Sequence, residues 1–153
     1  MSGVSIRIAR SDEAERLTDL AMRAKASWGY DAAFMEQCRA ELKVTPEKMG
    51  TWTVWVAEHD GQLAGVIALA TDGVRAEVEE FMVEPCVQGV GTGQALMDTL
   101  LAECRRLGLQ SVGLDADPNA ETIYLKFGFS TVGRSPSQSI PGRTLPRMVR
   151  QLR

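Results

Sequence analysis

The sequence predicts a single domain, 1–153, of the α/β (α+β) class, in which a mixed and mostly antiparallel central sheet carries helices on both faces. The 153 residues are 44% apolar and 24% charged, as in an ordinary soluble domain large enough to bury a core. Residues 51–83 alternate like three strands joined by two short turns, which predicts an antiparallel meander. Elsewhere helix and strand periods alternate, and strand–helix–strand units favour parallel neighbours.

A short strand and two helices are predicted before the meander. Residues 4–9 alternate apolar and polar side chains, as a strand does. The first helix opens at SDEAE, where Asp12 can cap it and Glu15, three residues on, completes a capping box. Gly29 ends this helix, and a second helix over about 32–42 carries its apolar residues on one side.

The meander itself is predicted from strand-forming residues separated by turn residues. TWTVWVAE, from Thr51, is rich in β-branched and aromatic residues, and HDGQ indicates a turn. LAGVIALA then returns as a second strand. A second turn at 71–73 leads into RAEVEEFMVEP, a third strand that ends at Pro85.

The part of the chain after the meander predicts a helix, a strand, a helix and two strands. An amphipathic helix follows a glycine-rich stretch and ends at Gly108. SVGLDA is typical of a short strand, and NAETIYLKFGF of a helix that runs into another strand. The tail LPRMVRQL alternates well enough to predict a last strand at the edge of the sheet.

Composition and charge limit the classes of partner and the compartment. A net charge of −3 argues against general nucleic-acid binding, which usually shows as a basic excess. Three cysteines without paired spacing and a single histidine, His59, indicate reduced thiols in a cytoplasmic protein and give no metal-binding pattern. The N-terminal residues contain no long apolar run, so neither a signal peptide nor a membrane anchor is expected.

The glycine-rich stretch VQGVGTGQALM leads directly into the predicted helix after the meander. Backbone without side chains beside a helix start is a common way to hold a phosphate. A nucleoside-triphosphate loop would need Lys and then Ser or Thr after the last glycine, but Gly93 is followed by Gln94 and Ala95. A dinucleotide fingerprint also fails, because its final glycine is missing when the pattern starts at Gly89 or Gly91.

The pattern that does fit is Gln88-x-x-Gly91-x-Gly93, placed between a strand and a helix. It resembles the acyl-coenzyme A signature of the GNAT superfamily of N-acetyltransferases. DPNAETIYLKFGF, over 117–129, resembles the downstream element of that superfamily at the expected distance. Alone, the first motif would also suit a plain strand-to-helix turn and the second an amphipathic core helix. Together, in order, they indicate a member of the superfamily, and the detailed resemblance covers about 78–129.

The resemblance implies that the strand around 81–83 splays from the strand around Leu114 and that acetyl-coenzyme A, the acetyl donor, lies in the gap. Glycine N–H groups at the positive end of the following helix would hold its pyrophosphate, and no metal is implied. An amine would attack the thioester directly, and Tyr124 would protonate the departing thiolate. The residues expected to bind the coenzyme are Phe81, Met82, Val83, Gln88, Gly89, Val90, Gly91, Thr92, Gly93, Asn119 and Tyr124.

A carboxylate on the third meander strand is expected to serve as the base. Strand alternation puts Glu77 and Glu79 on one face and Glu80 on the other. We favour Glu79 and then Glu80, with Asp115 on the neighbouring strand as a further candidate. Each of them could also be a solvated strand charge, and the acidic cluster suits a cationic amine.

The acceptor pocket is expected between two segments outside the coenzyme core. Trp28 and Tyr30, at the bend between the first two helices, and Arg143, before the last strand, are the candidate substrate-binding residues. The predicted function is acetyl transfer to a primary amine of a small molecule. The alternatives are a protein lysine or N-terminus as acceptor, and a non-catalytic acyl-coenzyme A sensor. A homodimer is compatible with the resemblance, since many relatives are dimers.

Overall fold

The structure, a computed structural model, describes residues 3–87 and 91–152. Its strands form one seven-stranded sheet in the order β1-β2-β3-β4-β5-β7-β6. The elements are β1 (Val4–Ile8), η1 (Ser11–Glu13), α1 (Ala14–Ala26), α2 (Ala32–Leu42), α3 (Pro46–Thr51), β2 (Thr53–His59), β3 (Gln62–Asp72), β4 (Arg75–Val83), η2 (Pro85–Val87), α4 (Thr92–Arg106), β5 (Ser111–Asp115), η3 (Pro118–Ala120), α5 (Glu121–Lys126), β6 (Ser130–Pro136) and β7 (Thr144–Gln151).

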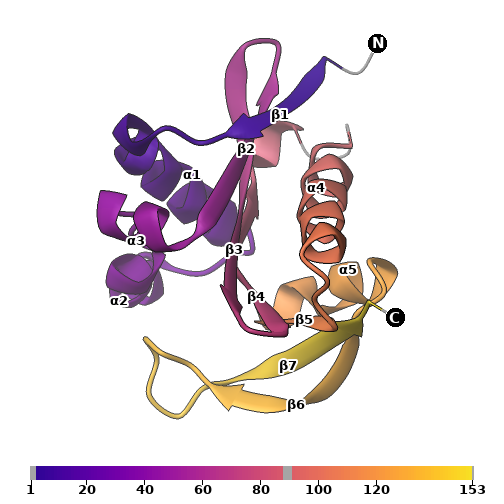
Figure 1. Cartoon of the computed structure of the whole chain (residues 1–153). Coiled ribbons are helices and arrows are strands. Elements are labelled where there is room, and N and C mark those ends of the chain that lie inside the picture. Colours follow the sequence, from indigo (N-terminus) through magenta and orange to yellow (C-terminus); the bar gives the residue numbers. More distant parts are fainter. Residues whose placement is uncertain (1–2, 88–90, 153) are drawn as a thin grey trace.

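The predicted fold class is confirmed. The β4–β5 pair is parallel, and the other strand pairs are antiparallel. Helices α1, α2 and α3 cover one face of the sheet, and α4 and α5 lie on the other (Figure 1). The largest core cluster lies on the α4 side, where Leu96, Leu100 and Met148 are fully buried. Each face is therefore sealed by an amphipathic layer, as the sequence periods predicted.

The entry into α1 differs from the predicted capping box. Glu13, not Glu15, reaches back along the chain, and its Oε1 accepts a hydrogen bond from the Arg10 backbone N–H at 2.8 Å. Asp12 accepts instead from the Arg10 side chain at 3.3 Å. The reason is a contact across elements: Glu13 Oε2 lies 2.7 Å from a guanidinium nitrogen of Arg7 on β1. Glu13 is thereby fully buried, residues Ser11–Glu13 form a 3-10 turn, and α1 begins at Ala14.

The position of the last strand also differs from the prediction. β7 lies between β5 and β6, so β6 and not β7 forms this edge of the sheet. Met148 on β7 pairs with Leu114 and is fully buried, whereas most of β6 is exposed. Alternation in the tail predicts a strand correctly, but it does not say which strand of the final hairpin turns inward.

Helix α3 was not predicted, although the sequence carries a signal for it. Thr45 caps the helix by accepting from the Lys48 backbone N–H at 3.1 Å, and Pro46 occupies the first turn. Threonine followed by proline is a known helix-start pattern. This helix places Lys48 and Trp52 near the end of β4, where they line a cleft.

The predicted splay of the central strands is confirmed. β4 pairs with β5 only from Arg75 to Glu77, opposite Ser111–Gly113. Beyond Glu77, β4 continues to Val83 against β3 alone, and β5 turns away toward β7. The sheet therefore opens at its centre, and Gly93 in the first turn of α4 lies against Phe81 and Val83 in the part of β4 that is not paired with β5.

Candidate active site

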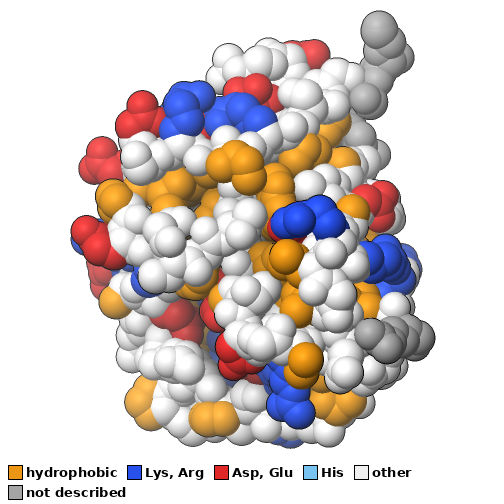
Figure 2. Space-filling model, viewed as in Figure 1, with side chains coloured by type: hydrophobic (Ala, Val, Ile, Leu, Met, Phe, Trp, Pro, Cys, Tyr) orange, Lys and Arg blue, Asp and Glu red, His pale blue; other side chains and the backbone are white. Residues whose placement is uncertain are grey.

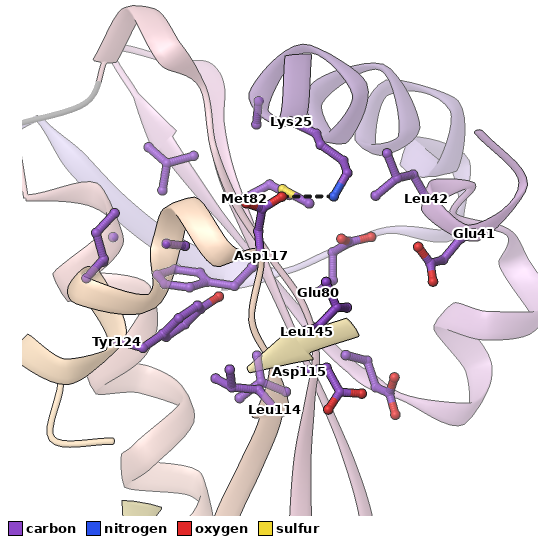
Figure 3. Close-up of a pocket in the computed structure, with 18 of the residues that line it drawn as sticks. Lys25, Glu41, Leu42, Glu80, Met82, Leu114, Asp115, Asp117, Tyr124 and Leu145 are labelled. Atoms are coloured by element: carbon purple, nitrogen blue, oxygen red, sulfur yellow. Dashed lines mark hydrogen bonds and ion pairs between the residues drawn. The ribbon is translucent and has the colours of Figure 1, made fainter. Parts of the chain in front are cut away.

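A cleft of about 1090 Å³ occupies the opening between β4 and β5. Its floor is the segment Glu77–Val83, and its walls come from α1, α2, α3, α5 and the β6–β7 loop (Figure 3). The first turn of α4, from Gly91 to Gln94, forms one end. Acidic side chains gather on this side of the molecule between α2–α3 and the β6–β7 hairpin (Figure 2). The cleft thus combines an anion-compatible helix start at one end with carboxylates at the other.

A β-bulge in β4 changes which carboxylates share a face. The register shifts between Ala68 and Leu69 of β3, so that Ala68 pairs with Glu80 while Leu69 pairs with Val78. Glu79 is the extra residue of the bulge. Because Glu77 pairs with Ala70, two residues after Ala68, Glu77 and Glu80 lie on the same face. The prediction that Glu80 lies opposite to Glu77 is therefore wrong.

Glu80 is a buried carboxylate, only 9% exposed, that lines the cleft. No hydrogen bond or ion pair satisfies it among the described residues. Burial raises the pKa of Glu80 to about 8, against the opposing charge of Lys48. Burial also raises the pKa of Glu79, with the charges of Glu77 and Asp115 adding to the effect. Glu80 can therefore exchange a proton near neutral pH more readily than an ordinary glutamate.

Tyr124, on α5, sits on the opposite wall of the cleft with 9% of its surface exposed. Its ring packs 5.9 Å from Phe81 on β4 and 5.8 Å from Phe129, between centroids. Burial, and then the charge of Glu80, raise the pKa of Tyr124. The hydroxyl therefore keeps its proton at neutral pH and can donate it. Tyr124 and Glu80 both point into the cavity in Figure 3.

The glycine-rich stretch ends in a left-handed residue at the start of α4. Gly91 is the N-cap with φ of +87°, a conformation that favours glycine. A side chain at Gly93 would touch Phe81 and Val83 at 3.6 Å, so the helix start lies directly against the floor of the cleft. Thr92, next in line, is 1% exposed and its hydroxyl has no partner among the described residues. Gln88, Gly89 and Val90 lie outside the described residues.

A polar network joins the bend between α1 and α2 to the end of β5. The Tyr30 hydroxyl lies 2.9 Å and 3.0 Å from the two oxygens of Asp117, and Arg143 donates to the same hydroxyl at 2.7 Å. Lys25 pairs with Asp117 at 3.1 Å. Burial pushes the pKa of Asp117 up, but the Asn119 backbone N–H and the Lys25 ammonium outweigh it, so this pKa is lowered. The network ties together three segments that surround the cleft.

Several residues that the sequence predicted to bind a ligand are hydrogen-bonded within this network. Arg143 donates a hydrogen bond to the Tyr30 hydroxyl and forms an ion pair with Asp117. The Asn119 side-chain amide donates to the Tyr30 hydroxyl at 3.0 Å. Trp28, by contrast, lines the cleft directly and is 40% exposed. Their assignment to acceptor or coenzyme stays a prediction.

Sequence reasoning missed the residues that α2 and α3 bring to the cleft. Glu41, Lys48 and Trp52 line it together with Lys25 and Asp117. Asp117 could have been found, because it opens the DPNA segment of the second motif. The others carry no local signal, since only packing of the helices on β4 brings them to the site.

Over the residues that the structure describes, no group of three or more His, Cys, Asp or Glu side chains could hold a metal ion. Within the same ranges, no helix has the length and apolar character needed to cross a membrane.

The family model described as an acetyltransferase (GNAT) domain matches residues 11–151. The chain belongs to the GNAT acetyltransferase family. Among curated GNAT relatives, it is 35% identical over 82 residues to serotonin N-acetyltransferase 2 of Oryza sativa subsp. japonica, which covers 50% of the chain and 41% of that protein. It is 29% identical over 150 residues to mycothiol acetyltransferase of Beutenbergia cavernae, covering 91% of the chain and 49% of that protein. The chain spans less than half the length of these two relatives.

Solved GNAT structures share the fold. PaiA N-acetyltransferase from Thermoplasma acidophilum, in complex with coenzyme A, superposes with a TM-score of 0.79 at 18% identity over 97% of the chain and 98% of that protein. The acetyltransferase YncA from Salmonella typhimurium, with its cofactor acetyl-CoA, gives 0.68 at 24% identity over 98% and 94%. The open seven-stranded sheet is therefore the GNAT sheet.

Proposed function

We propose that this protein transfers the acetyl group of acetyl-coenzyme A directly to a primary amine of a small molecule. One observation carries the proposal: the cleft at the β4–β5 opening brings a buried tyrosine hydroxyl and a buried, unpartnered carboxylate to one cavity. Tyr124 and Glu80 are the proton donor and the proton acceptor that such a transfer requires. Membership of the GNAT acetyltransferase family supports the same reaction class.

The donor would bind along the free side of β4. Beyond Glu77 this side of the strand has no strand partner among the described residues, so the backbone of Phe81, Met82 and Val83 is available to pair with an extended amide-containing arm. The first turn of α4, with Gly91 and Gly93, would receive the pyrophosphate.

The residues of the cleft then account for each proton. Glu80 takes a proton from the ammonium form of the acceptor, and the free amine attacks the thioester carbon. A backbone N–H near Val83 stabilises the oxyanion that develops there. The carbon–sulfur bond breaks, and Tyr124 gives its proton to the departing thiolate. The second proton, which the nitrogen loses in becoming an amide, returns through solvent to the Tyr124 oxygen. No covalent intermediate with the enzyme is needed.

The choice between the two candidate bases favours Glu80 over Glu79, the reverse of the order predicted from the sequence. Glu80 is buried, and the raised pKa of about 8 suits a base that works near neutral pH. Glu79 is exposed at the bulge and is assigned an electrostatic role.

A small acceptor is favoured over a protein because the acceptor end of the cleft is closed by a loop. The Ser139 hydroxyl, in the β6–β7 loop, lies 3.2 Å from a carboxylate oxygen of Glu41 on α2. Ile140 in the same loop packs against the cluster of Met35, Cys38 and Leu42. A polypeptide would have to displace this contact, whereas a small amine would not.

Thiol release from acetyl-coenzyme A, measured across amines, amino acids and peptides, tests the proposal. Tyr124→Phe is expected to reduce turnover on the order of a hundredfold while coenzyme A binding survives. Gly91→Glu is expected to abolish coenzyme A binding by placing a negative charge and a strained side chain at the helix start. Turnover that Tyr124→Phe leaves unchanged with every amine, together with intact binding, would instead indicate a sensor domain.

A further inference from the structure

We infer that the acceptor is a diamine and that Glu41 holds its second, non-reacting ammonium group. This inference rests on the proposed acetyl transfer and assigns the class of its substrate. It comes from the balance of charge in the cleft and from where Glu41 lies.

The cleft contains an excess of carboxylates without partners. Six carboxylates and two lysines line it: Lys25, Glu41, Lys48, Glu77, Glu79, Glu80, Asp115 and Asp117. Arg147 pairs with Glu77 and Asp115, and Lys25 pairs with Asp117. Among the described residues this leaves Glu41, Glu79 and Glu80 without an ion pair, against Lys48 as the one remaining cation of the lining. With Glu80 ionised, as it must be to act as the base, the acceptor end therefore lacks two positive charges.

Lys48 does not neutralise these carboxylates by direct contact. Its ammonium nitrogen donates to the backbone carbonyls of Lys43 at 2.7 Å and Glu41 at 3.5 Å, at the end of α2. It also lies 6.0 Å from the centroid of the Trp52 ring. Lys48 thus caps the last turn of α2 and leaves the carboxylates facing the cavity to a ligand.

Glu41 is placed to receive the far end of the acceptor. It comes from α2, whereas Glu80 comes from β4, and both carboxylates point into the same space in Figure 3. The two groups are close enough for the charge of Glu41 to raise the pKa of Glu80. Glu41 is exposed where it lines the cleft, and its carboxylate accepts a hydrogen bond from the Ser139 hydroxyl at 3.2 Å.

A buried, unpartnered carboxylate distinguishes this site from a plain acidic surface. Glu80 is only 9% exposed and has no protein partner among the described residues, so its carboxylate depends on water or a ligand in the cleft. A reacting amine would complete Glu80, and a second amine on the same molecule would complete Glu41. The apolar side chains of Leu42 and Trp52 line the same end and suit a methylene linker.

The excess of carboxylates in the cleft also predicts that diamines are better acceptors than amino acids. A free amino acid brings one ammonium and one carboxylate, and its carboxylate would meet Glu41 or Glu79. Monoamines satisfy Glu80 alone and leave Glu41 unpaired. We therefore expect diamines to be preferred over both classes.

Steady-state kinetics with chain-matched amines test the inference. Putrescine is compared with n-butylamine and cadaverine with n-pentylamine, at saturating acetyl-coenzyme A. We expect kcat/KM for each diamine to exceed that of its monoamine by about tenfold or more, as one additional charged contact provides. Glu41→Gln is expected to bring this ratio to roughly one. Glu36→Gln, on the same helix but 68% exposed and paired with Arg39, is the matched control and should keep the wild-type ratio.

The salt dependence of wild-type KM adds a readout that needs no variant. KM for the diamines is expected to rise more steeply with ionic strength than KM for the monoamines, because two charges are screened instead of one. Equal salt dependence, or monoamines acetylated as well as diamines, overturns the inference while leaving the proposed function standing. The absence of acetylation with any amine overturns the proposed function itself.

Discussion

Two buried glutamates, Glu13 and Glu80, differ in whether the fold supplies them with partners. Glu13, before α1, is fully buried and meets three arginines: Oε2 lies 2.7 Å from Arg7, 3.5 Å from Arg10 and 3.1 Å from Arg16. The hydrogen bonds from Arg7 lower the pKa of Glu13 to about 2, against the effect of burial. Glu80 is buried almost as completely, yet it has no such partner among the described residues, and its pKa is raised to about 8.

The difference predicts a structural role for Glu13 and a functional role for Glu80. A buried carboxylate that the fold itself satisfies contributes to stability, whereas one that the fold leaves unsatisfied costs stability and is retained for another reason. Only the unsatisfied glutamate of this pair lines the cleft. The contrast predicts that replacing Glu13 changes folding and that replacing Glu80 changes turnover.

The largest expected effect is on activity, from Glu80→Gln. If Glu80 is the base, the variant should lose about 10²–10³-fold in kcat/KM, because the proton acceptor is gone while the shape is kept. The wild-type pH profile of kcat/KM should rise toward a pH of about 8, since the carboxylate must be ionised to act, and the variant should lose that rise. Thiol-release kinetics across pH measure both.

Glu79→Gln is the matched control for this prediction. It removes the same charge from the adjacent residue, and we expect a loss of less than about tenfold with the pH profile kept. A larger loss for Glu79→Gln than for Glu80→Gln would restore the order predicted from the sequence and would assign the base to the bulge residue.

Glu13→Gln is expected to affect stability in place of activity. Removing the carboxylate leaves Arg7 facing a neutral amide, and breaking such a buried pair typically costs about 3 kcal/mol in the free energy of unfolding. For a chain of this size the melting temperature should fall by roughly 6–12 °C. Thermal unfolding measures the shift, and kcat should be kept at a temperature where the variant is folded. Unchanged stability would show that the arginine cluster does not act as a structural centre.

The pH dependence of stability should run in opposite directions for the two glutamates. The pKa of Glu13 is lowered to about 2, so its contribution is present above the unfolded value of 4.5 and is lost as pH falls toward 2. The pKa of Glu80 is raised to about 8, so its contribution is present below 4.5 and is lost as pH rises toward 8. The stability difference between wild type and Glu13→Gln should therefore shrink in acid.

The difference between Glu80→Gln and wild type should instead grow in favour of the variant toward alkaline pH. Denaturant unfolding of the three proteins at several pH values between about 3 and 9 measures both curves. Curves that change in the same direction would contradict the distinction between the two carboxylates.

Local patterns were sufficient to predict most of the fold. The alternation over residues 51–83 predicted the meander, and the glycine at 108 correctly marked the end of α4. The prediction that β7 forms the edge of the sheet was wrong, because the strand order of a hairpin depends on partners far away in the sequence. The predicted capping box of α1 was wrong for the same reason, because Arg7, which pairs with Glu13, lies on β1.

Part of the candidate site could also be predicted from local patterns, and part could not. The two motifs directed attention to the start of α4 and to Tyr124, and both line the cleft. The face of Glu80 was mispredicted because one extra residue in β4 inverts the alternation beyond it. Glu41 was missed entirely, since no short pattern shows that α2 will pack over the end of β4. Sequence motifs therefore identified cleft residues on α4 and α5 but none on α2 and α3.

Thr92 allows the smallest and most specific test of the same contrast. In the described part of the chain, the buried polar or charged residues are Glu13, Glu80 and Thr92. The Thr92 hydroxyl has no hydrogen-bond partner there. Thr92→Val keeps the shape and removes the unsatisfied group, so the free energy of unfolding should rise by about 1 kcal/mol. If the hydroxyl is kept for the coenzyme, affinity for coenzyme A should fall by roughly fivefold in calorimetry.

Thr99→Val is the control, because the Thr99 hydroxyl on the same helix already donates to the Ala95 carbonyl at 2.9 Å. It should lose a little stability and bind coenzyme A normally. The two variants should therefore change stability in opposite directions, as the two glutamates do. If both threonines behave alike, an unpartnered buried group in this protein is no guide to a ligand, and the same inference at Glu80 would lose its support.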